Sequence, residues 1–315
     1  MGRRLKTPAL ANGVVVEDRT ASDVHVRIYR PAGLSGFVPA LFWIHGGGFI
    51  AGRVEQDERS SAEFAHELGI VVVAVRYRLA PEHPFPAPLD DCYLALKWVF
   101  QDAGALGIDP SRIAIGGASA GGGLAAGLAL MAHDRGEVTP VFQLLVYPML
   151  DDRTTTRTDL DPANVRVWTV SSNRYGWTSY LGQISGGAGV SPYAAPARRA
   201  SLSGLPPAWV GVGTLDLFHD EGVSYANRLA EAGVACELLV VPGAYHVFDW
   251  FSPQANVVKE FRASQVAALR RALSTPGDVL SSGATNAQPA PRSVLSLDAG
   301  VRTAGTRTRL GSRPI

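Results

Sequence analysis

The stretch AIGGASAGGGLAAGLAL, residues 114–130, joins a strand-like apolar run to a helix-like one, and small residues surround Ser119 at the junction. Glycine inside a regular element costs about 0.5–1 kcal/mol relative to alanine, so glycines gathered here need another purpose. Residues 117–121, GASAG, match G-x-S-x-G, the pattern of a strained strand-to-helix turn that exposes a serine hydroxyl. Only small neighbours fit where such a turn brings the chain close to itself. The pattern predicts Ser119 as a nucleophile.

A nucleotide-binding loop is the alternative use of these glycines. Gly121-x-Gly123-x-x-Ala126 resembles a dinucleotide fingerprint, but its glycines fall inside the expected helix and no acidic strand end follows about twenty residues on. No G-x-x-x-x-G-K-[ST] motif is present. The two cysteines, Cys92 and Cys236, lack metal-ligand spacing and lie in apolar runs. We therefore expect neither a cofactor nor a metal.

The region around Ser119 alternates strand-like and helix-like runs. The first expected strand alternates polar and apolar residues, as an antiparallel or edge strand does, whereas later ones are continuously apolar, as in a parallel sheet buried on both faces. This alternation predicts a doubly wound α/β fold. The expected strands are 24–29, 40–45, 70–75, 112–117, 142–147, 208–213 and 236–241, and the expected helices are 57–68, 88–101, 120–134, 219–232 and 254–273.

The charge balance limits the partners. The 315 residues carry 29 basic and 28 acidic side chains, a net charge of +1, which gives no electrostatic reason to expect nucleic acid or an anionic membrane. No apolar run approaches the roughly 20 residues of a membrane span, and the N-terminal sequence does not resemble a secretory signal. We predict a cytoplasmic protein that acts on a small molecule.

The chain divides into three stretches, the second of which contains an insertion. Residues 24–274 form the predicted catalytic domain, and within it residues 151–195 interrupt the alternation, as a cap inserted between core strands does. A short N-terminal segment, 1–23, precedes the domain. Residues 275–315 are rich in Ser, Gly, Ala, Pro and Thr, a composition that predicts a flexible tail.

A second glycine run, WIHGGGF at residues 43–49, follows the second expected core strand. Consecutive glycines leave backbone N–H groups unshielded, and such groups can converge on a developing oxyanion. An HGGG-type motif accompanies the serine turn in lipases and esterases. His45 precedes the serine in sequence, so we expect it to hold the loop by hydrogen bonds rather than act as the base.

The serine needs a base and a carboxylate, which follow it in this fold class in the order Ser, Asp or Glu, His. Of the later histidines, His133 lies about four helical turns away and His219 lies on a helix start, which leaves His246 as the expected base. Asp216 ends a core strand and is the expected acid. Asp220 is its rival, although a helix-capping role suits it better.

Five motifs in order, HGGGF, YRLAPEHPFPAPLDD, GGASAGGGLA, LPPAWVGVGTLDLFHDEGVSYANRL and VPGAYHVF, resemble the hormone-sensitive-lipase family of α/β-hydrolases, the bacterial HGGG-bearing esterases. The resemblance covers about residues 24–270 and implies a mostly parallel eight-stranded sheet with a helical cap, and a homodimer. It implies a serine carboxylesterase with an acyl-enzyme intermediate. The implied roles are nucleophile Ser119, acid Asp216, base His246 and oxyanion-hole donors Gly47, Gly48 and Ala120.

This chain departs from the family pattern at three places. Ala118 stands where an acidic residue is frequent, and Leu217 replaces the usual proline after the acid. The segment before residue 24 is shorter than usual, which predicts a reduced cap. Candidate pocket residues for short or medium acyl chains or aryl esters, each equally consistent with a core position, are Phe49, Trp168, Trp177, Val247 and Phe248.

Other functions fit the same residues. An amidase, an arylformamidase or a lactonase would use an identical triad, because the pocket selects the leaving group. A receptor that keeps this fold without its chemistry is a further alternative, although such relatives typically replace the histidine that is present here as His246.

Overall fold

The computed structural model describes residues 13–158, 165–274 and 295–296. Its strands form one sheet in the order β1-β2-β4-β3-β5-β6-β7-β8-β9. Strand β2 pairs antiparallel with both β1 and β4, and every other neighbouring pair is parallel. The strands are β1 (Val14–Ala21), β2 (Val24–Pro31), β3 (Val38–Ile44), β4 (Val71–Arg76), β5 (Ile108–Ala118), β6 (Phe142–Val146), β7 (Ala208–Gly213), β8 (Cys236–Val241) and the two-residue β9 (Leu295–Ser296).

The predicted eight-stranded, mostly parallel sheet is confirmed in β1–β8. Strands β4, β6 and β7 are buried along almost their whole length, which their unbroken apolar sequences require. Strand β1 instead alternates buried and exposed residues, as an outer antiparallel strand does. Because β1 lies in the sheet, the sheet begins at Val14, ten residues before the predicted domain boundary at residue 24.

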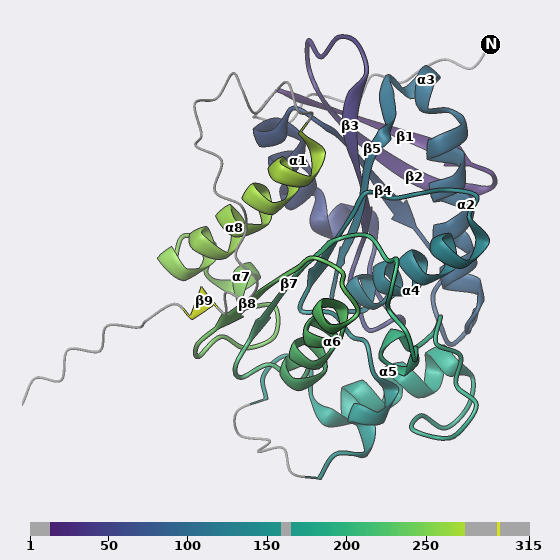
Figure 1. Cartoon of the computed structure of the whole chain (residues 1–315), viewed down its shortest axis with the longest axis vertical. Helices are drawn as coiled ribbons and strands as arrows, with labels where there is room; N and C mark the ends of the chain where they lie inside the picture. The colour runs from purple at the N-terminus through teal and green to yellow at the C-terminus, as the bar shows by residue number, and fades with distance from the viewer. Residues whose placement is uncertain (1–12, 159–164, 275–294, 297–315) are drawn as a thin grey trace, which may run out of the picture.

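Helices cover both faces of the sheet (Figure 1). Helices α1 and α8 pack with one buried cluster, and α2, α4 and α6 pack with the other. The helices are α1 (Glu58–Leu68), α2 (Ala87–Gln101), α3 (Ala103–Leu106), α4 (Ala120–Arg135), α5 (Val170–Leu181), α6 (His219–Glu231), α7 (Phe248–Phe251) and α8 (Asn256–Leu273), with 3-10 turns at Val54–Asp57, Asp152–Thr156 and Pro196–Arg198. This three-layer arrangement places the carboxyl ends of the parallel strands along one edge, where ligands bind in such folds.

The insertion between β6 and β7 contains one long helix, α5, which the sequence analysis did not place. Thr169 caps this helix, its hydroxyl accepting from the Ser172 N–H at 3.2 Å, and Gly182 ends it in the left-handed conformation. Residues 159–164 of the predicted cap, and nearly all of the predicted tail 275–315, lie outside the described residues. Residues 1–12 lie outside them too.

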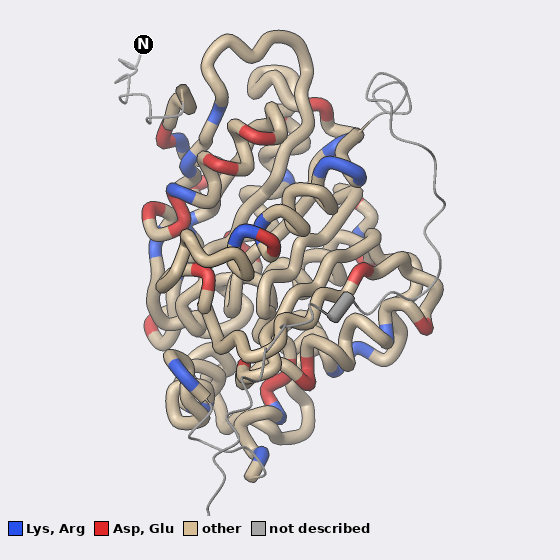
Figure 2. Tube along the Cα trace, turned by 90° about the vertical axis from the view of Figure 1, so that its left-hand side faces the viewer, with Lys and Arg blue, Asp and Glu red and all other residues tan. Residues whose placement is uncertain are grey.

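The surface carries charges of both signs. In the view of Figure 2, basic and acidic residues are interspersed along the chain and neither sign has a face of its own. None of the helices in the described ranges combines the length and the apolar character needed to cross a membrane.

Candidate active site

Ser119 occupies the sharp turn between β5 and α4. Its backbone has φ +57° and ψ −121°, a strained conformation for a residue with a side chain. The Ser119 N–H donates to the Val146 carbonyl at 2.9 Å, and its own carbonyl accepts from Met149 N–H at 3.0 Å. Strand β6 and the residues after it therefore hold the turn in place.

The glycines beside Ser119 are explained by close backbone approach. A Cβ at Gly117 would lie 2.3 Å from the Gly121 carbonyl oxygen, and a Cβ at Gly121 would lie 2.1 Å from the Ile44 carbonyl oxygen. Both distances are far inside van der Waals contact with backbone that cannot move aside. Glycine at these positions lets the serine turn and the end of β3 pack together.

Ser119, His246 and Asp216 form one continuous hydrogen-bonded chain. Ser119 Oγ lies 2.9 Å from His246 Nε2, and His246 Nδ1 lies 2.8 Å from Asp216 Oδ2. All three residues are at most 6% exposed. The other carboxylate oxygen of Asp216 accepts from the Phe218 N–H at 2.9 Å, which fixes the carboxylate toward the imidazole. The Nδ1–H thus points at the acid, and Nε2 is free to accept from the serine.

The rival residues lie elsewhere. Asp220 is bound to Arg157 Nη1 at 2.5 Å and to the His219 Nδ1 at 2.7 Å, on the exposed start of α6. His133 is exposed on α4. In the described part of the chain, no group of three or more His, Cys, Asp and Glu side chains is arranged to hold a metal ion.

The glycine loop after β3 crosses directly over the serine turn. A Cβ at Gly46 would lie 2.9 Å from the Ala118 carbonyl oxygen and 3.4 Å from Ser119 Cβ. Gly47 and Gly48 follow with φ of +125° and +61°, which favour glycine. Ala120 is the first residue of α4, so its N–H has no acceptor within the helix. The three backbone groups predicted to bind an oxyanion therefore belong to segments that meet at Ser119.

His45 lies beneath this loop, as the sequence analysis expected. Its Nδ1 is 2.8 Å from the Gly46 carbonyl oxygen, and its ring stacks on Tyr77 at 4.3 Å between centroids. The Tyr77 hydroxyl donates to the His45 carbonyl at 2.9 Å. Burial lowers the pKa of His45 to about 4, so the ring is neutral and its Nδ1–H donates to the carbonyl.

The candidate pocket residues separate into two groups. Trp168 is half-buried and covers the glycine loop so closely that a Cβ at Gly48 would lie 2.0 Å from its indole ring. Val247 is also half-buried. Phe49 and Trp177 are at most 1% exposed and pack against each other with centroids 5.2 Å apart, while Phe248 packs on Phe261. Phe49, Trp177 and Phe248 are therefore core residues behind the site, so only the first group offers surface to a ligand.

Two aromatic residues beside His246 were missed. Phe218 and Tyr147 each present a ring edge-on to the imidazole, with centroids 5.0 Å away in both cases. The sequence offered one indication for each residue. Phe218 lies two residues after Asp216, and Tyr147 lies at the end of a core strand. Neither position identifies the partner ring, which comes from a distant segment.

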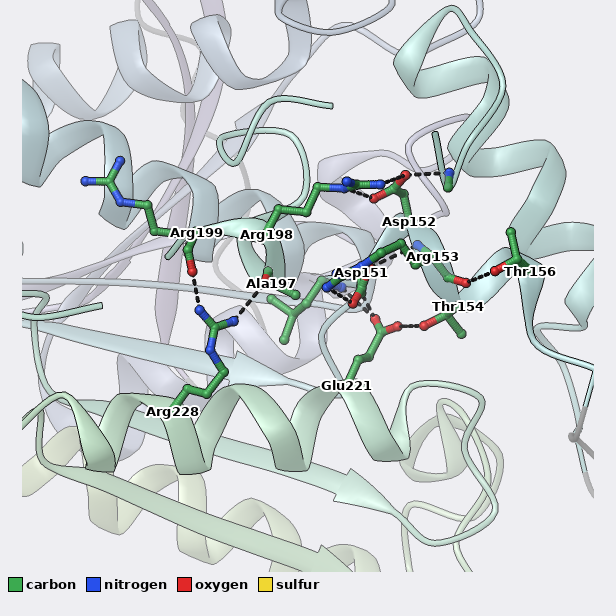
Figure 3. A network of polar contacts seen from close by, with 12 residues as sticks. Asp151, Asp152, Arg153, Thr154, Thr156, Ala197, Arg198, Arg199, Glu221 and Arg228 are labelled. Carbon is green, nitrogen blue, oxygen red and sulfur yellow. Dashed lines mark hydrogen bonds and ion pairs between the residues drawn. The ribbon is translucent and has the colours of Figure 1, made fainter. Parts of the chain in front are cut away.

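A buried polar network fastens the cap insertion to α6 (Figure 3). Glu221 accepts the Leu150 N–H at 2.6 Å and the Asp151 N–H at 3.3 Å, and Thr154 donates its hydroxyl to the second carboxylate oxygen. Farther along α6, Arg228 donates to the carbonyls of Ala197 and Arg199. Both ends of the insertion are thus bound to the helix that begins just after Asp216.

A second buried carboxylate joins the two ends of the insertion to each other. Asp152 is fully buried and pairs with Arg198, whose Nε lies 2.6 Å from Oδ1. The same carboxylate accepts the Gly186 N–H at 2.6 Å. These contacts connect the start of the insertion to Gly186 within it and to the residues that precede β7.

Glu221 makes the stability of this attachment dependent on pH. Burial raises its pKa well above the ordinary value of 4.5, although the hydrogen bonds from Thr154 and Leu150 oppose the shift. The folded state therefore holds the proton to higher pH than the unfolded state, and the free energy of unfolding falls as pH rises above about 4.5 toward the folded pKa. Glu221→Gln mimics the protonated carboxyl. We therefore expect the free energy of unfolding, measured by urea denaturation, to fall less steeply with rising pH in the variant than in the wild type over this window.

Burial also raises the pKa of two other carboxyl groups, Asp57 and Asp249, but these are common to both proteins and cancel in the comparison. Glu221→Ala is the matched variant without hydrogen bonds, and it should lower stability at every pH because it leaves buried N–H groups unpaired. Parallel stability curves for the wild type and Glu221→Gln would contradict the assignment.

Comparison with known proteins places this geometry in a family. Residues 41–249 match the family described by its alpha/beta hydrolase fold. Carboxylesterase NlhH of Mycobacterium tuberculosis is 39% identical over 281 residues, 86% of this chain and 87% of the relative. Ethyl acetate hydrolase of Pseudomonas putida is 33% identical over 257 residues, 76% of each chain. A solved structure, Bacterial Heroin Esterase, superposes with a TM-score of 0.80 at 42% identity, over 84% of this chain and 87% of that one. The predicted resemblance is confirmed: the chain belongs to the hormone-sensitive-lipase family of bacterial carboxylesterases, within the α/β-hydrolase superfamily.

Proposed function

We propose that this chain is a serine carboxylesterase in which Ser119 is the nucleophile, His246 the general base and Asp216 the acid. The observation that carries the proposal is the unbroken hydrogen-bonded chain Ser119–His246–Asp216, with links of 2.9 and 2.8 Å. This order of contacts is what activates a serine hydroxyl, because the base takes its proton and the carboxylate orients and stabilises the imidazolium.

Acylation follows from the contacts. Ser119 Oγ attacks the ester carbonyl carbon while its proton passes to His246 Nε2, and the carbonyl oxygen becomes an oxyanion. The N–H groups of Gly47, Gly48 and Ala120 donate hydrogen bonds to that oxyanion, a contribution worth about 10²–10³ in rate for each donor. The imidazolium then protonates the leaving alcohol oxygen as the carbon–oxygen bond breaks.

Deacylation repeats the same proton movements with water. His246 takes a proton from a water molecule, whose oxygen attacks the acyl carbon, and then returns the proton to Ser119 Oγ. The carboxylic acid leaves and the serine is restored. No step needs a cofactor or a metal.

The substrate range that we propose is short- to medium-chain acyl esters or aryl esters. Trp168 covers Gly48, and the large side chains of Phe49, Trp177 and Phe248 already fill the core behind the loop and the histidine. The relative from Pseudomonas putida, an ethyl acetate hydrolase, supports a short acyl chain.

Hydrolysis of p-nitrophenyl esters from acetyl to palmitoyl tests the substrate range. We expect kcat/KM to peak at short or medium chains and to fall toward palmitoyl, because a long chain has to displace the cover provided by Trp168. Trp168→Ala should extend turnover to longer chains, with Tyr175→Ala, an exposed aromatic change on α5, as the matched control.

A peak at palmitoyl would contradict the proposed range. No turnover of any ester by folded protein would contradict the esterase activity itself and direct attention to amide and formamide substrates. Activity on those substrates with none on esters would favour the amidase or arylformamidase alternative.

We propose in addition that the protein acts as a homodimer in the cytoplasm. Three exposed apolar side chains on α7 and α8, Trp250, Phe251 and Val257, support a subunit contact, with exposures of 46%, 61% and 36%. Both cysteines are free thiols, which fits a reducing compartment. Sedimentation of the wild type and of Trp250→Ser/Phe251→Ser tests the dimer, since the double variant should be monomeric.

A further inference from the structure

His246 is located on the loop that follows β8 and precedes the short helix α7, and the next residue, Val247, has a strained φ of +53°. The hydrogen bonds to Ser119 and Asp216 both lie in the plane of the imidazole. They restrain a tilt of the ring about the line that joins its two nitrogens less than they restrain its position, so packing against the ring adds to the restraint on its plane.

Tyr147 packs against the imidazole, which also contacts Phe218. The rings of Tyr147 and His246 are steeply inclined to each other, with centroids 5.0 Å apart and an interplanar angle of 71°. Tyr147 is 1% exposed and has φ +35°, a strained conformation for a residue with a side chain. Its N–H donates to the Gly211 carbonyl at 2.7 Å, so the strained backbone is held by the neighbouring strand β7.

Asp249 fixes the far end of Tyr147. The tyrosine hydroxyl donates to Asp249 Oδ1 at 3.0 Å, and Arg262 of α8 pairs with the other carboxylate oxygen at 3.5 Å. Asp249 is 5% exposed and lies three residues after His246, in α7. The Tyr147–Asp249 hydrogen bond therefore ties the segment that carries the base to the sheet strand that lies under the serine turn.

Arg262 extends the attachment outward. Its Nη1 lies 3.2 Å from Glu63 Oε2 and 3.3 Å from Ser60 Oγ on α1. Helices α1 and α8, which cover the same face of the sheet, thus share one guanidinium with the carboxylate behind the histidine. Asp249 is held by packed helices rather than by a loop.

We propose that Tyr147 and Asp249 are positioning residues for His246, acting as one hydrogen-bonded unit that holds the plane of the imidazole between Ser119 and Asp216. The proposal rests on the proposed role of His246 as the base. Neither residue touches the reacting atoms, so the unit acts on kcat through the geometry of the base. A displacement of about 1 Å in a catalytic group can cost about 10²-fold in rate.

Four variants test separately what the Tyr147 ring, the Tyr147 hydroxyl, the hydrogen bond between Tyr147 and Asp249, and the charge of Asp249 contribute to kcat. Tyr147→Phe keeps the ring and loses the hydroxyl, and we expect kcat to fall about tenfold, because the ring is then no longer tied to Asp249 and orients His246 less well. Tyr147→Leu loses the ring contact and should lower kcat about 100-fold. Asp249→Ala should match Tyr147→Phe, whereas Asp249→Asn keeps an acceptor for the hydroxyl and should recover most of the loss.

Two kinetic readouts and a control variant distinguish a positioning role from a merely structural one. KM for p-nitrophenyl acetate should stay unchanged while kcat falls, and Tyr147→Phe combined with Asp249→Ala should be no worse than either change alone. Tyr225→Phe is the control, because Tyr225 is 1% exposed and its buried hydroxyl has no hydrogen-bond partner in the described structure. It should leave kcat unchanged.

Proton NMR provides a readout that does not depend on activity. The His246 Nδ1–H bonded to Asp216 should give a slowly exchanging downfield signal in the wild type and in Tyr147→Phe, and the signal should broaden or vanish in Tyr147→Leu. A sharp signal in a folded Tyr147→Leu protein would overturn the proposal, and so would full kcat in that variant or a change confined to KM. If the wild type hydrolyses no ester, the proposed function fails, and the NMR signal still decides the positioning role.

Discussion

Replacing Ser119 by alanine is expected to lower kcat by about 10⁶-fold, the size of loss found when the nucleophile of a serine hydrolase is removed. The physical reason is that the hydroxyl oxygen 2.9 Å from His246 Nε2 is the atom that we expect to form the covalent intermediate. Without it the imidazole has no proton to accept. Residual turnover from the remaining backbone donors should be small but measurable.

The measurement is steady-state hydrolysis of p-nitrophenyl acetate together with a pre-steady-state burst. The wild type should release one p-nitrophenol per active site in the burst if acylation is faster than deacylation, and Ser119→Ala should release none. Thermal unfolding is the control. The alanine side chain also fits the small-residue turn, so the melting temperature should not fall. Normal turnover by Ser119→Ala would refute the nucleophile assignment.

Asp216→Asn is expected to lower kcat by about 10⁴-fold with little change in KM, the size of effect found when a triad carboxylate is neutralised. Asp216 Oδ2 accepts from His246 Nδ1 at 2.8 Å and thereby keeps the proton on that nitrogen. An asparagine amide placed there donates instead, which favours the tautomer with the proton on Nε2. That nitrogen then cannot accept from Ser119.

Asp220→Asn is the matched control, four residues further along the same segment. Asp220 is 59% exposed at its side chain and pairs with Arg157 and His219, so the change should leave kcat within about twofold. Both variants are compared by kcat, KM and thermal unfolding. A large loss of kcat in Asp220→Asn, together with normal kcat in Asp216→Asn, would show that Asp220 and not Asp216 is the acid.

Local sequence pattern predicted the central part of the fold because its causes are local. Six strands were found from their apolar runs, since strands buried on both faces need such runs whatever packs on them, and β2 was found from its alternation of polar and apolar residues. The first strand, Val14–Ala21, was missed, because its alternation of polar and apolar residues is interrupted by charges and is decided by its pairing with β2. Helix α5 was missed because its sequence, VSSNRYGWTSYL, has no clear apolar face.

The sequence pattern also predicted the serine turn. Gly117 and Gly121 are required because a Cβ at either position would lie 2.3 or 2.1 Å from a backbone carbonyl oxygen, so no residue with a side chain fits there. Only glycine satisfies such a constraint, so the constraint is recognisable in the sequence as a motif. The same reasoning gave the contact order Ser119, His246, Asp216, because strand ends in a parallel sheet meet at one edge.

Tertiary structure alone decided which side chains surround these residues. Phe49 and Trp177 were candidates for a pocket, but the packing of α5 against the glycine loop buries them both. Glu221 is bonded to Leu150 and Thr154, and Asp249 to Tyr147, across 67 to 102 residues of sequence, and no local pattern predicts that these segments meet. A backbone constraint restricts the residue at its own position, whereas a side-chain contact can be satisfied by many pairs of residues. The residues of the proposed triad could therefore be predicted from the sequence alone, whereas only the folded chain determined which residues hold them in place.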